Sequence, residues 1–284
     1  MLRKIAKWSA IVVGALVGLL LLAVLVIYVA GGRVLAKQWD VPLTSIAIPD
    51  DSATVAEGRR LAAIRGCTGC HKEDLSGQLF FDDPLIARVT ATNLSTRIPD
   101  YSDGELARMI RHGVGLDGTS SPAMPSSMFY HLSDRDVGAI IAFLRTVPPV
   151  ENDLPTTTIR LMGRFGLVTG KYHTQATLID HEADRIPPVT EDGTPNGHYL
   201  AYTTCTECHG QTLEGGGFSA APPLVIVRGY SADEFTRLMR SGEPRGGQEL
   251  EMMGGVARSR FAHFSDEEIA ALYEYLGSMG VAGG

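Results

Sequence analysis

An internal repeat constrains the fold of this 284-residue chain more than any other feature. Three segments of the first half recur in the same order in the second half, at intervals of about 130 residues. The matching pairs are 67–71 (CTGCH) with 205–209 (CTECH), 102–113 with 231–242, and 132–144 with 264–276. Because the order is kept while the intervals differ, we expect one duplicated domain with loops of different length.

The repeated segments have the pattern of helices. Ser133 and Ser265 stand as N-caps, and each is followed three residues later by an acidic residue. Apolar residues then recur at helical spacing in both copies. No run alternates convincingly with a period of two, as a half-buried strand would. The sequence therefore predicts an all-α fold made of two small domains.

The first thirty residues differ in composition from the rest. Residues 10–30 carry no charge, and at about 1.5 Å per residue they span roughly 30 Å, the thickness of a bilayer's hydrocarbon core. A cleaved signal peptide has a shorter apolar region, about 7–15 residues, and Tyr28-Val29-Ala30 is a poor cleavage site. Arg3, Lys4 and Lys7 precede the run, so we expect an uncleaved anchor with its N-terminal end in the cytoplasm.

Composition excludes two classes of protein. The chain is 44% hydrophobic and 20% charged, which is ordinary globular usage and argues against wholesale disorder. Its formal net charge is −7, so it has no basic excess to neutralise phosphates. We therefore expect no nucleic-acid partner.

The repeated CxxCH pentapeptide is the pattern for covalent attachment of c-type haem. It contains all the cysteines of the chain: Cys67, Cys70, Cys205 and Cys208. Each thiol can form a thioether to one vinyl group, while His71 or His209 supplies the proximal ligand. Zinc would favour cysteine pairs only about 15–20 residues apart, and a thioredoxin-like site would need a βαβ pattern. The sequence therefore predicts two covalently attached haem c groups.

The order of these segments resembles the small c-type cytochrome domain, so the chain looks like a membrane-anchored dihaem cytochrome c. The resemblance covers nearly all of residues 53–150 and 191–284. It implies that the last helix of each domain crosses the first, with a small residue against an aromatic one. The expected contacts are Gly58 with Phe143 and Gly197 with Tyr275.

The resemblance also implies a methionine as the second axial ligand of each iron. In the first domain it points to Met124 between two prolines, whereas Met128 is expected in the core. The second domain lacks a Met-Pro pair. There we expect Met253, directly before Gly254 in a loop, with Met252 or a ligand other than methionine as the alternatives.

Four polar residues lie near these predicted sites. Asn93 and Arg97 stand where family members bond the haem propionates. His131 and His263 precede the last helix of each domain, and we expect them to be polar residues at a helix entrance rather than ligands.

These predictions give a six-part chain. The parts are a cytoplasmic tail (1–9), the anchor (10–30), a connector (31–52), the first haem domain (53–150), a surface linker (151–190) and the second haem domain (191–284). We expect an electron carrier of a respiratory chain, not an enzyme, on the periplasmic face of the cytoplasmic membrane, with redox partner proteins. The alternatives are a cytochrome subunit of a larger membrane dehydrogenase or oxidase, and a dihaem peroxidase.

Overall fold

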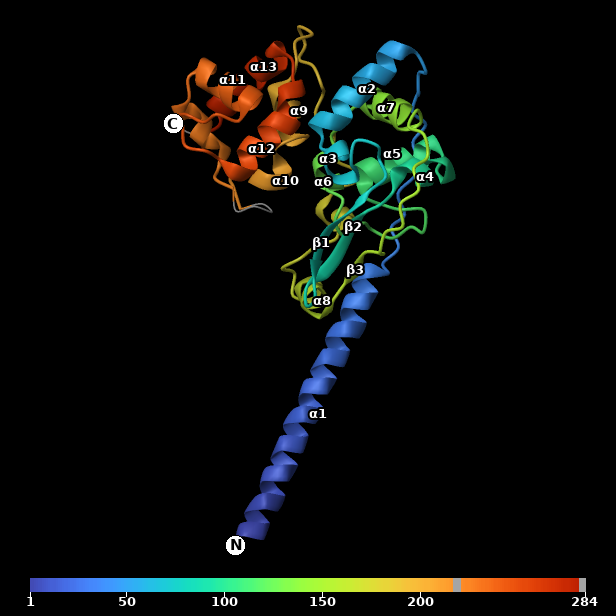
Figure 1. Ribbon diagram of the computed structural model, residues 1–284, viewed down its shortest axis with the longest axis vertical. Helices are drawn as coiled ribbons and strands as arrows, with labels where there is room; N and C mark the ends of the chain where they lie inside the picture. Colours follow the sequence, from blue (N-terminus) through green and yellow to red (C-terminus); the bar gives the residue numbers. More distant parts are fainter. Residues whose placement is uncertain (217–220, 281–284) are drawn as a thin grey trace.

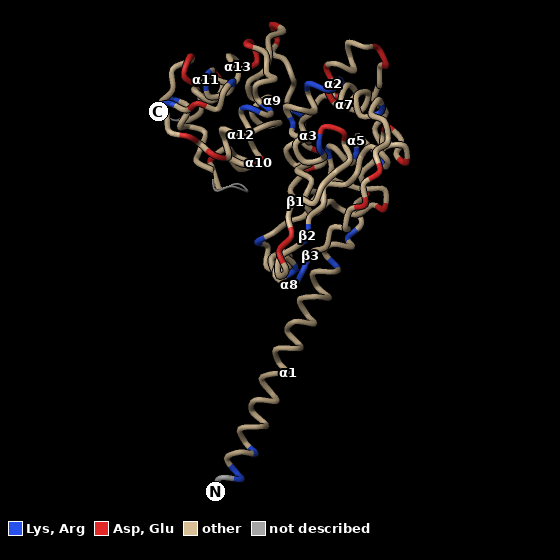
Figure 2. Tube along the Cα trace, in the orientation of Figure 1, with Lys and Arg blue, Asp and Glu red and all other residues tan. Residues whose placement is uncertain are grey.

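The computed structural model describes residues 1–216 and 221–280. A long helix, α1 (Leu2–Leu35), leads into two helical units that lie side by side at its C-terminal end (Figure 1). Within these residues, α1 is the one helix long and apolar enough to cross a bilayer. Figure 2 shows basic residues at the N-terminal end of α1 and an uncharged stretch along most of its length.

Each unit is built from a corresponding series of helices, which confirms the predicted duplication and the predominantly helical fold. The first unit contains α2 (Ser52–Ile64), α3 (Cys67–His71), α4 (Leu94–Arg97), η1 (Ile98–Asp100), α5 (Asp103–His112), α6 (Ser126–Phe129) and α7 (Asp134–Leu144). The second contains α9 (Gly197–Tyr202), α10 (Thr206–His209), η3 (Leu224–Gly229), α11 (Ala232–Ser241), α12 (Glu251–Ser259), η4 (Phe261–His263) and α13 (Asp266–Ser278). Both expected N-caps are formed: the Ser133 hydroxyl accepts from the Asp136 amide, and Ser265 forms a capping box with Glu268.

The first and last helices of each unit cross at a glycine. A Cβ atom at Gly58 would lie 1.8 Å from the backbone oxygen of Ala139 and 3.0 Å from the Phe143 Cβ. At Gly197 it would lie 2.1 Å from the oxygen of Ala271 and 2.6 Å from the Cβ of Tyr275. Only a residue without a side chain permits this approach, so the expected glycine–aromatic contacts are present in both units.

A small antiparallel sheet, which the sequence pattern did not indicate, extends from the first unit. Its strands are β1 (Gln78–Asp83), β2 (Ala87–Ala91) and β3 (Thr158–Ile159), in the order β1-β2-β3. The pairing of β1 with β2 shifts register between Leu79 and Phe81. The middle of β1 is exposed on both faces, so its residues do not alternate between apolar and polar.

The linker contains more structure than its sequence suggests. It supplies β3, the helix α8 (Leu161–Val168) and the 3₁₀ turn η2 (Gln175–Leu178). Helix α8 buries Gly163 and Leu167 on one face and exposes apolar residues on the other. A helix that is apolar on both faces has no amphipathic signature, which explains why the pattern did not predict it.

The two units share one continuous hydrophobic core. At their contact, the hydroxyl of Tyr199 in α9 donates to Asp136 at 2.5 Å and accepts from the Ser133 amide at 3.1 Å. Nearby, the Arg60 guanidinium of α2 pairs with Glu268 of α13 at 2.7 Å. A tyrosine of the second unit therefore hydrogen-bonds the first turn of α7 in the first unit, and an ion pair joins α2 to α13.

We predict that Gly58→Ala destabilises the protein by about 1–3 kcal/mol or more, because the added methyl group meets the backbone of α7 and neither helix can yield. Gly277→Ala is the matched control, since Gly277 also lies in a helix but has no atom within 4 Å of an added Cβ. That change should be neutral or stabilise the protein by up to about 1 kcal/mol. Chemical denaturation followed by circular dichroism measures both, and equal stability of the two variants would contradict the close crossing.

Candidate functional site

The two CxxCH segments form short helices, α3 and α10, with closely similar surroundings. The Nδ1 atom of His71 lies 2.7 Å from the carbonyl oxygen of Thr92, and that of His209 lies 2.8 Å from the carbonyl oxygen of Pro222. A carbonyl oxygen only accepts, so Nδ1 carries the proton in both rings and Nε2 keeps its lone pair. This is the usual arrangement of a histidine that ligates a metal through Nε2.

Burial reinforces this state of the two rings. It lowers the pKa of both His71 and His209, and the carbonyl hydrogen bonds only partly oppose the effect. Both imidazoles are therefore held neutral, as a metal ligand must be.

Three of the four cysteines have the properties of buried thiols. Burial raises the pKa of Cys67 and of Cys205 to about 11, and it also raises the pKa of Cys70. Zinc binds thiolates, which these environments disfavour. Among the described residues, no group of three or more His, Cys, Asp or Glu side chains is arranged to hold a metal ion. The surroundings thus favour thioether attachment over a zinc site.

The chain leaves both histidines through the same strained turn. Leu75 and Leu213 are fully buried and adopt positive φ angles of 56° and 62°, which are uncommon for a residue with a side chain. Each turn lets a glycine amide bond back to the histidine carbonyl, from Gly77 at 2.9 Å and from Gly215 at 2.8 Å. Strained backbone that recurs at matching positions marks both loops as parts of a functional site.

The candidate methionines differ in their surroundings. Met124 and Met253 are half-buried against the hydrophobic core, Met128 is fully buried within it, and Met252 is 56% exposed. The expected loop around Met253 is instead the helix α12, which continues through Gly254. Helical geometry, and not a sharp turn at the glycine, therefore directs Met252 and Met253 to different sides.

The linker fastens the segment that carries Met124. The amide of Gln175 donates to the Ser121 carbonyl at 3.0 Å, and the hydroxyl of Tyr172 donates to the carbonyl of Pro122. Burial raises the pKa of Tyr172 to about 12, so this donor keeps its proton at neutral pH. Residues that lie 50 or more positions along the chain from this segment thus hold it in place.

The two CxxCH helices approach each other across the contact between the units (Figure 1). The side chain of Arg260, which follows α12, lies against α3: a Cβ atom at Gly66 would be 2.2 Å from its Cζ. The same guanidinium pairs with Glu207 of α10 at 3.0 Å. One arginine of the second unit therefore touches both attachment segments.

The surroundings of Arg65, two residues before Cys67, indicate whether these residues fit a haem. Its side chain is 2% exposed, and its Nε and Nη1 atoms have no hydrogen-bond partner within the described part of the chain. The guanidinium lies 5.9 Å from the Tyr199 ring centroid, and its charge acts on the thiols of both Cys67 and Cys205. Two buried guanidinium N–H groups without acceptors are best satisfied by an anionic group, and a haem carries two carboxylates. The residues therefore fit the group.

Other sequence-derived assignments have different outcomes. The Asn93 amide, expected near a propionate, donates to the Val150 carbonyl at 2.8 Å, and its oxygen accepts from Ser95. Arg97 is exposed and lies 3.8 Å from Asp100. His131 accepts from the Ile186 amide at 3.2 Å, in agreement with a polar role at a helix entrance.

Sequence reasoning did not single out Arg65, Arg260 or Tyr172. Arg65 had a usable signal in its position two residues before Cys67. The other two residues are far along the chain from the segments they touch, so no local pattern marks them.

Comparison with known proteins agrees with this geometry. The family model for cytochrome c matches residues 55–148 and 195–280. The chain is 26% identical to the gluconate 2-dehydrogenase cytochrome c subunit of Pantoea cypripedii, over 84% of this chain and 63% of that protein.

Two further relatives are also named as cytochrome subunits. Identity is 29% to the cytochrome c subunit of alcohol dehydrogenase (quinone) from Komagataeibacter europaeus, over 81% of this chain and 57% of the relative. Identity is 23% to the fructose dehydrogenase cytochrome subunit of Gluconobacter japonicus, over 89% of this chain and 57% of the relative. These alignments span 57–63% of the length of the three relatives. Because the family model covers both CxxCH-bearing units, the chain belongs to the cytochrome c family, whose members carry covalently bound haem.

Proposed function

We propose that this protein transfers electrons through two haem c groups as the cytochrome subunit of a membrane dehydrogenase, tethered to the outer face of the cytoplasmic membrane. The observation that carries this proposal is the duplicated site: two CxxCH helices, each ending in a histidine whose Nδ1 atom is fixed by a backbone carbonyl. When bound, haem c supplies one-electron redox chemistry.

The protein's own side chains complete each site in this proposal. Cys67 and Cys70 would hold one haem and Cys205 and Cys208 the other, and His71 and His209 would ligate the iron through Nε2. Met124 and Met253 are the proposed further ligands. Both are half-buried against the core, whereas Met252 is directed to solvent. A thioether ligand favours ferrous iron and raises the potential of its site.

The contact between the units supports electron transfer within one molecule. Arg260 touches both CxxCH helices, and the buried charge of Arg65 acts on a thiol of each. A single core continues through the contact, so the two sites are held at a fixed separation. Two sites in one rigid body can pass an electron without a diffusional encounter.

The names of the relatives support a dehydrogenase as the electron donor. All three are cytochrome subunits of dehydrogenases that are named for gluconate, fructose or alcohol. Purification of the full chain in mild detergent tests this partner. We expect a stoichiometric dehydrogenase subunit to accompany it, whereas a chain recovered alone from fresh membranes would favour a free-standing carrier.

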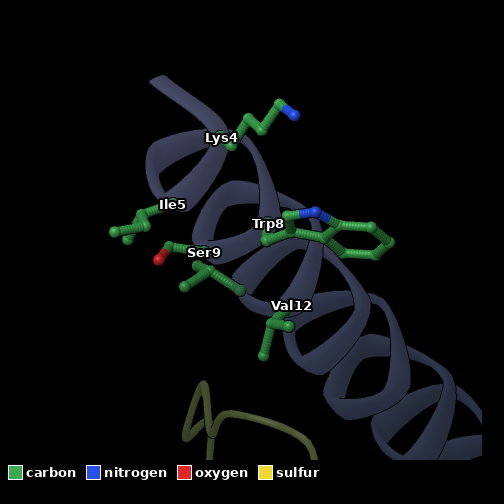
Figure 3. Close-up of a pocket in the computed structure, with 6 residues that line it drawn as sticks. Lys4, Ile5, Trp8, Ser9 and Val12 are labelled. Carbon is green, nitrogen blue, oxygen red and sulfur yellow. The ribbon is translucent and has the colours of Figure 1, made fainter. Parts of the chain in front are cut away.

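The structure of α1 supports retention of the anchor. The Arg164 guanidinium of α8 donates to the Tyr28 carbonyl at 3.0 Å, and Val34 and Leu35 pack with buried Leu167. Cleavage after Ala30 would remove Tyr28 and with it the bond to Arg164, whereas Val34 and Leu35 would stay with the domain. Figure 3 shows Trp8 near the N-terminal end of α1, and twenty residues separate it from Tyr28, about 30 Å of helix. Aromatic residues at this separation match the two interfaces of a bilayer.

We predict two covalent haems per chain. Because thioethers are covalent, haem staining should persist on a denaturing gel, and C67S together with C70S should remove one of two equivalents. The matched pair C205S and C208S should remove the other. Two equivalents in either double variant would overturn the assignment.

We predict that Met124→Ala and Met253→Ala each remove part of the weak far-red band of ferric iron bound to a methionine sulfur. Each should also lower the potential of its own haem, because the thioether no longer stabilises ferrous iron. Met252→Ala is the control and should change neither quantity. If Met252→Ala alone affects the second site, the ligand is misassigned by one residue. If neither Met252→Ala nor Met253→Ala affects the second site, its sixth ligand is not a methionine. The dihaem peroxidase then becomes the favoured function.

We predict that both haem domains are accessible from outside the cytoplasmic membrane. Protease added to intact spheroplasts should digest them, since Arg3, Lys4 and Lys7 favour a cytoplasmic N-terminus. A cytoplasmic marker protein should survive the same treatment. Full protection of the domains, or release of the haem protein by osmotic shock alone, would contradict the proposed topology.

A further inference from the structure

An exposed apolar surface lies where the sheet and α8 meet the anchor. Leu85 and Ile86 occupy the turn between β1 and β2, and α8 contributes the rest. The five side chains are between 42% and 61% exposed: Leu85, Ile86, Met162, Phe165 and Val168. We call these five residues the anchor-proximal patch.

The patch is one continuous feature of the fold. The Met162 amide donates to the Leu85 carbonyl at 2.9 Å, and an added Cβ at Gly163 would lie 2.5 Å from the Ile86 oxygen. The turn and the helix are therefore packed together. Met162, Phe165 and Val168 recur every three residues, so they form a stripe on the face of α8 opposite buried Gly163 and Leu167. A contiguous exposed surface of this kind marks an interaction site.

The position of α8 beside α1 indicates what contacts the patch. Helix α8 packs against the last turns of α1, where the Cβ of Arg164 lies 2.7 Å from the Cβ that Gly31 lacks. The Arg164 guanidinium also stacks 4.3 Å from the Tyr28 ring centroid. Tyr28 marks the end of the uncharged stretch of α1, so α8 lies beside the anchor at the level where it leaves the hydrocarbon (Figure 1).

The charges around the patch are compatible with a lipid surface. Two carboxylates of the hairpin lie beside the patch. That of Asp83 accepts from the amides of Leu85 at 2.8 Å and Ile86 at 2.9 Å. That of Asp82 is paired with Arg160 at 2.7 Å and with Arg88 at 3.0 Å. The exposed residues Arg33 of α1 and Lys171, which follows α8, add positive charge at the same end of the unit. Apart from Asp83, whose carboxylate is hydrogen-bonded within the turn, phosphate headgroups would meet paired or basic side chains.

We propose that the anchor-proximal patch lies in the interfacial layer of the bilayer, so that the first haem domain is seated on the membrane and not only tethered to it. This inference rests on the proposed retention of α1. The apolar stripe of α8 enters the boundary between headgroups and acyl chains, as the apolar face of an interfacial helix does. With α1 and α8 both held by lipid, the domain has a defined tilt and its CxxCH site a fixed height above the membrane.

The test uses the full haem-loaded chain in nanodiscs of phosphatidylethanolamine and phosphatidylglycerol. Since the proposed thioethers occupy the native cysteines, one introduced cysteine is the only thiol that a nitroxide spin label can modify. Labels are placed singly at Ile86→Cys and Phe165→Cys. The control is Ala56→Cys, which is also exposed and lies in α2, the helix at the end of the unit far from α1 (Figure 1). Collision rates with oxygen and with a water-soluble nickel complex are measured on the oxidised protein, because a reductant would consume the oxygen and reduce the nitroxide.

We expect the oxygen-to-nickel ratio at positions 86 and 165 to exceed that at position 56 severalfold, because oxygen concentrates in lipid and the nickel complex does not. Ratios equal to the control would overturn the proposal. Low rates with both reagents would also overturn it, since they indicate a protein that covers the patch. Co-migration of the chain with the nanodiscs reports separately on the anchor, so a failure of α1 is distinguished from a failure of the patch. The haem spectrum of each labelled variant verifies its fold.

Discussion

The close crossing of the first and last helices in each unit positions the CxxCH segment that follows the first helix. Gly58 brings α2 to within a backbone contact of α7, and Gly197 does the same for α9 and α13. Only two residues separate the end of α2 from Cys67, so the direction of α2 determines where α3 begins. Because backbone rather than flexible side chains meets at the crossing, a small displacement there cannot be absorbed locally.

Each histidine depends on a second part of the chain. The carbonyls that fix Nδ1 belong to Thr92 and Pro222, which lie 21 and 13 residues beyond the histidines. The turns at Leu75 and Leu213 send the chain along this route at the expense of a strained backbone. The same solution in two loops of different length indicates that orienting the imidazole, and not loop length, is the fixed requirement.

Helix α1 and the linker connect the N-terminal end of the protein to the first site. Helix α8 packs on α1, and four residues after α8 ends, Tyr172 bonds the carbonyl of Pro122 in the segment that carries Met124. The linker thus holds the Met124 segment in place relative to α1. A chain of direct contacts joins α1 to a proposed ligand of the iron, and a second set, through Arg260 and Tyr199, joins the two units.

The sequence by itself determined the duplication, the helices, the long apolar N-terminal segment and the two CxxCH segments, because each depends on residues close together in the chain. It also predicted the Gly58 and Gly197 crossings through resemblance to a family. The tertiary structure alone decided the sheet, since exposed β1 does not alternate, and α8, which is apolar on both faces. Only the tertiary structure places Arg260 against both attachment segments and Arg65 beside Tyr199 of the second unit. Only the tertiary structure shows that the Asn93 amide donates to the Val150 carbonyl. Those contacts join residues up to about 190 positions apart, a separation at which local periodicity carries no information.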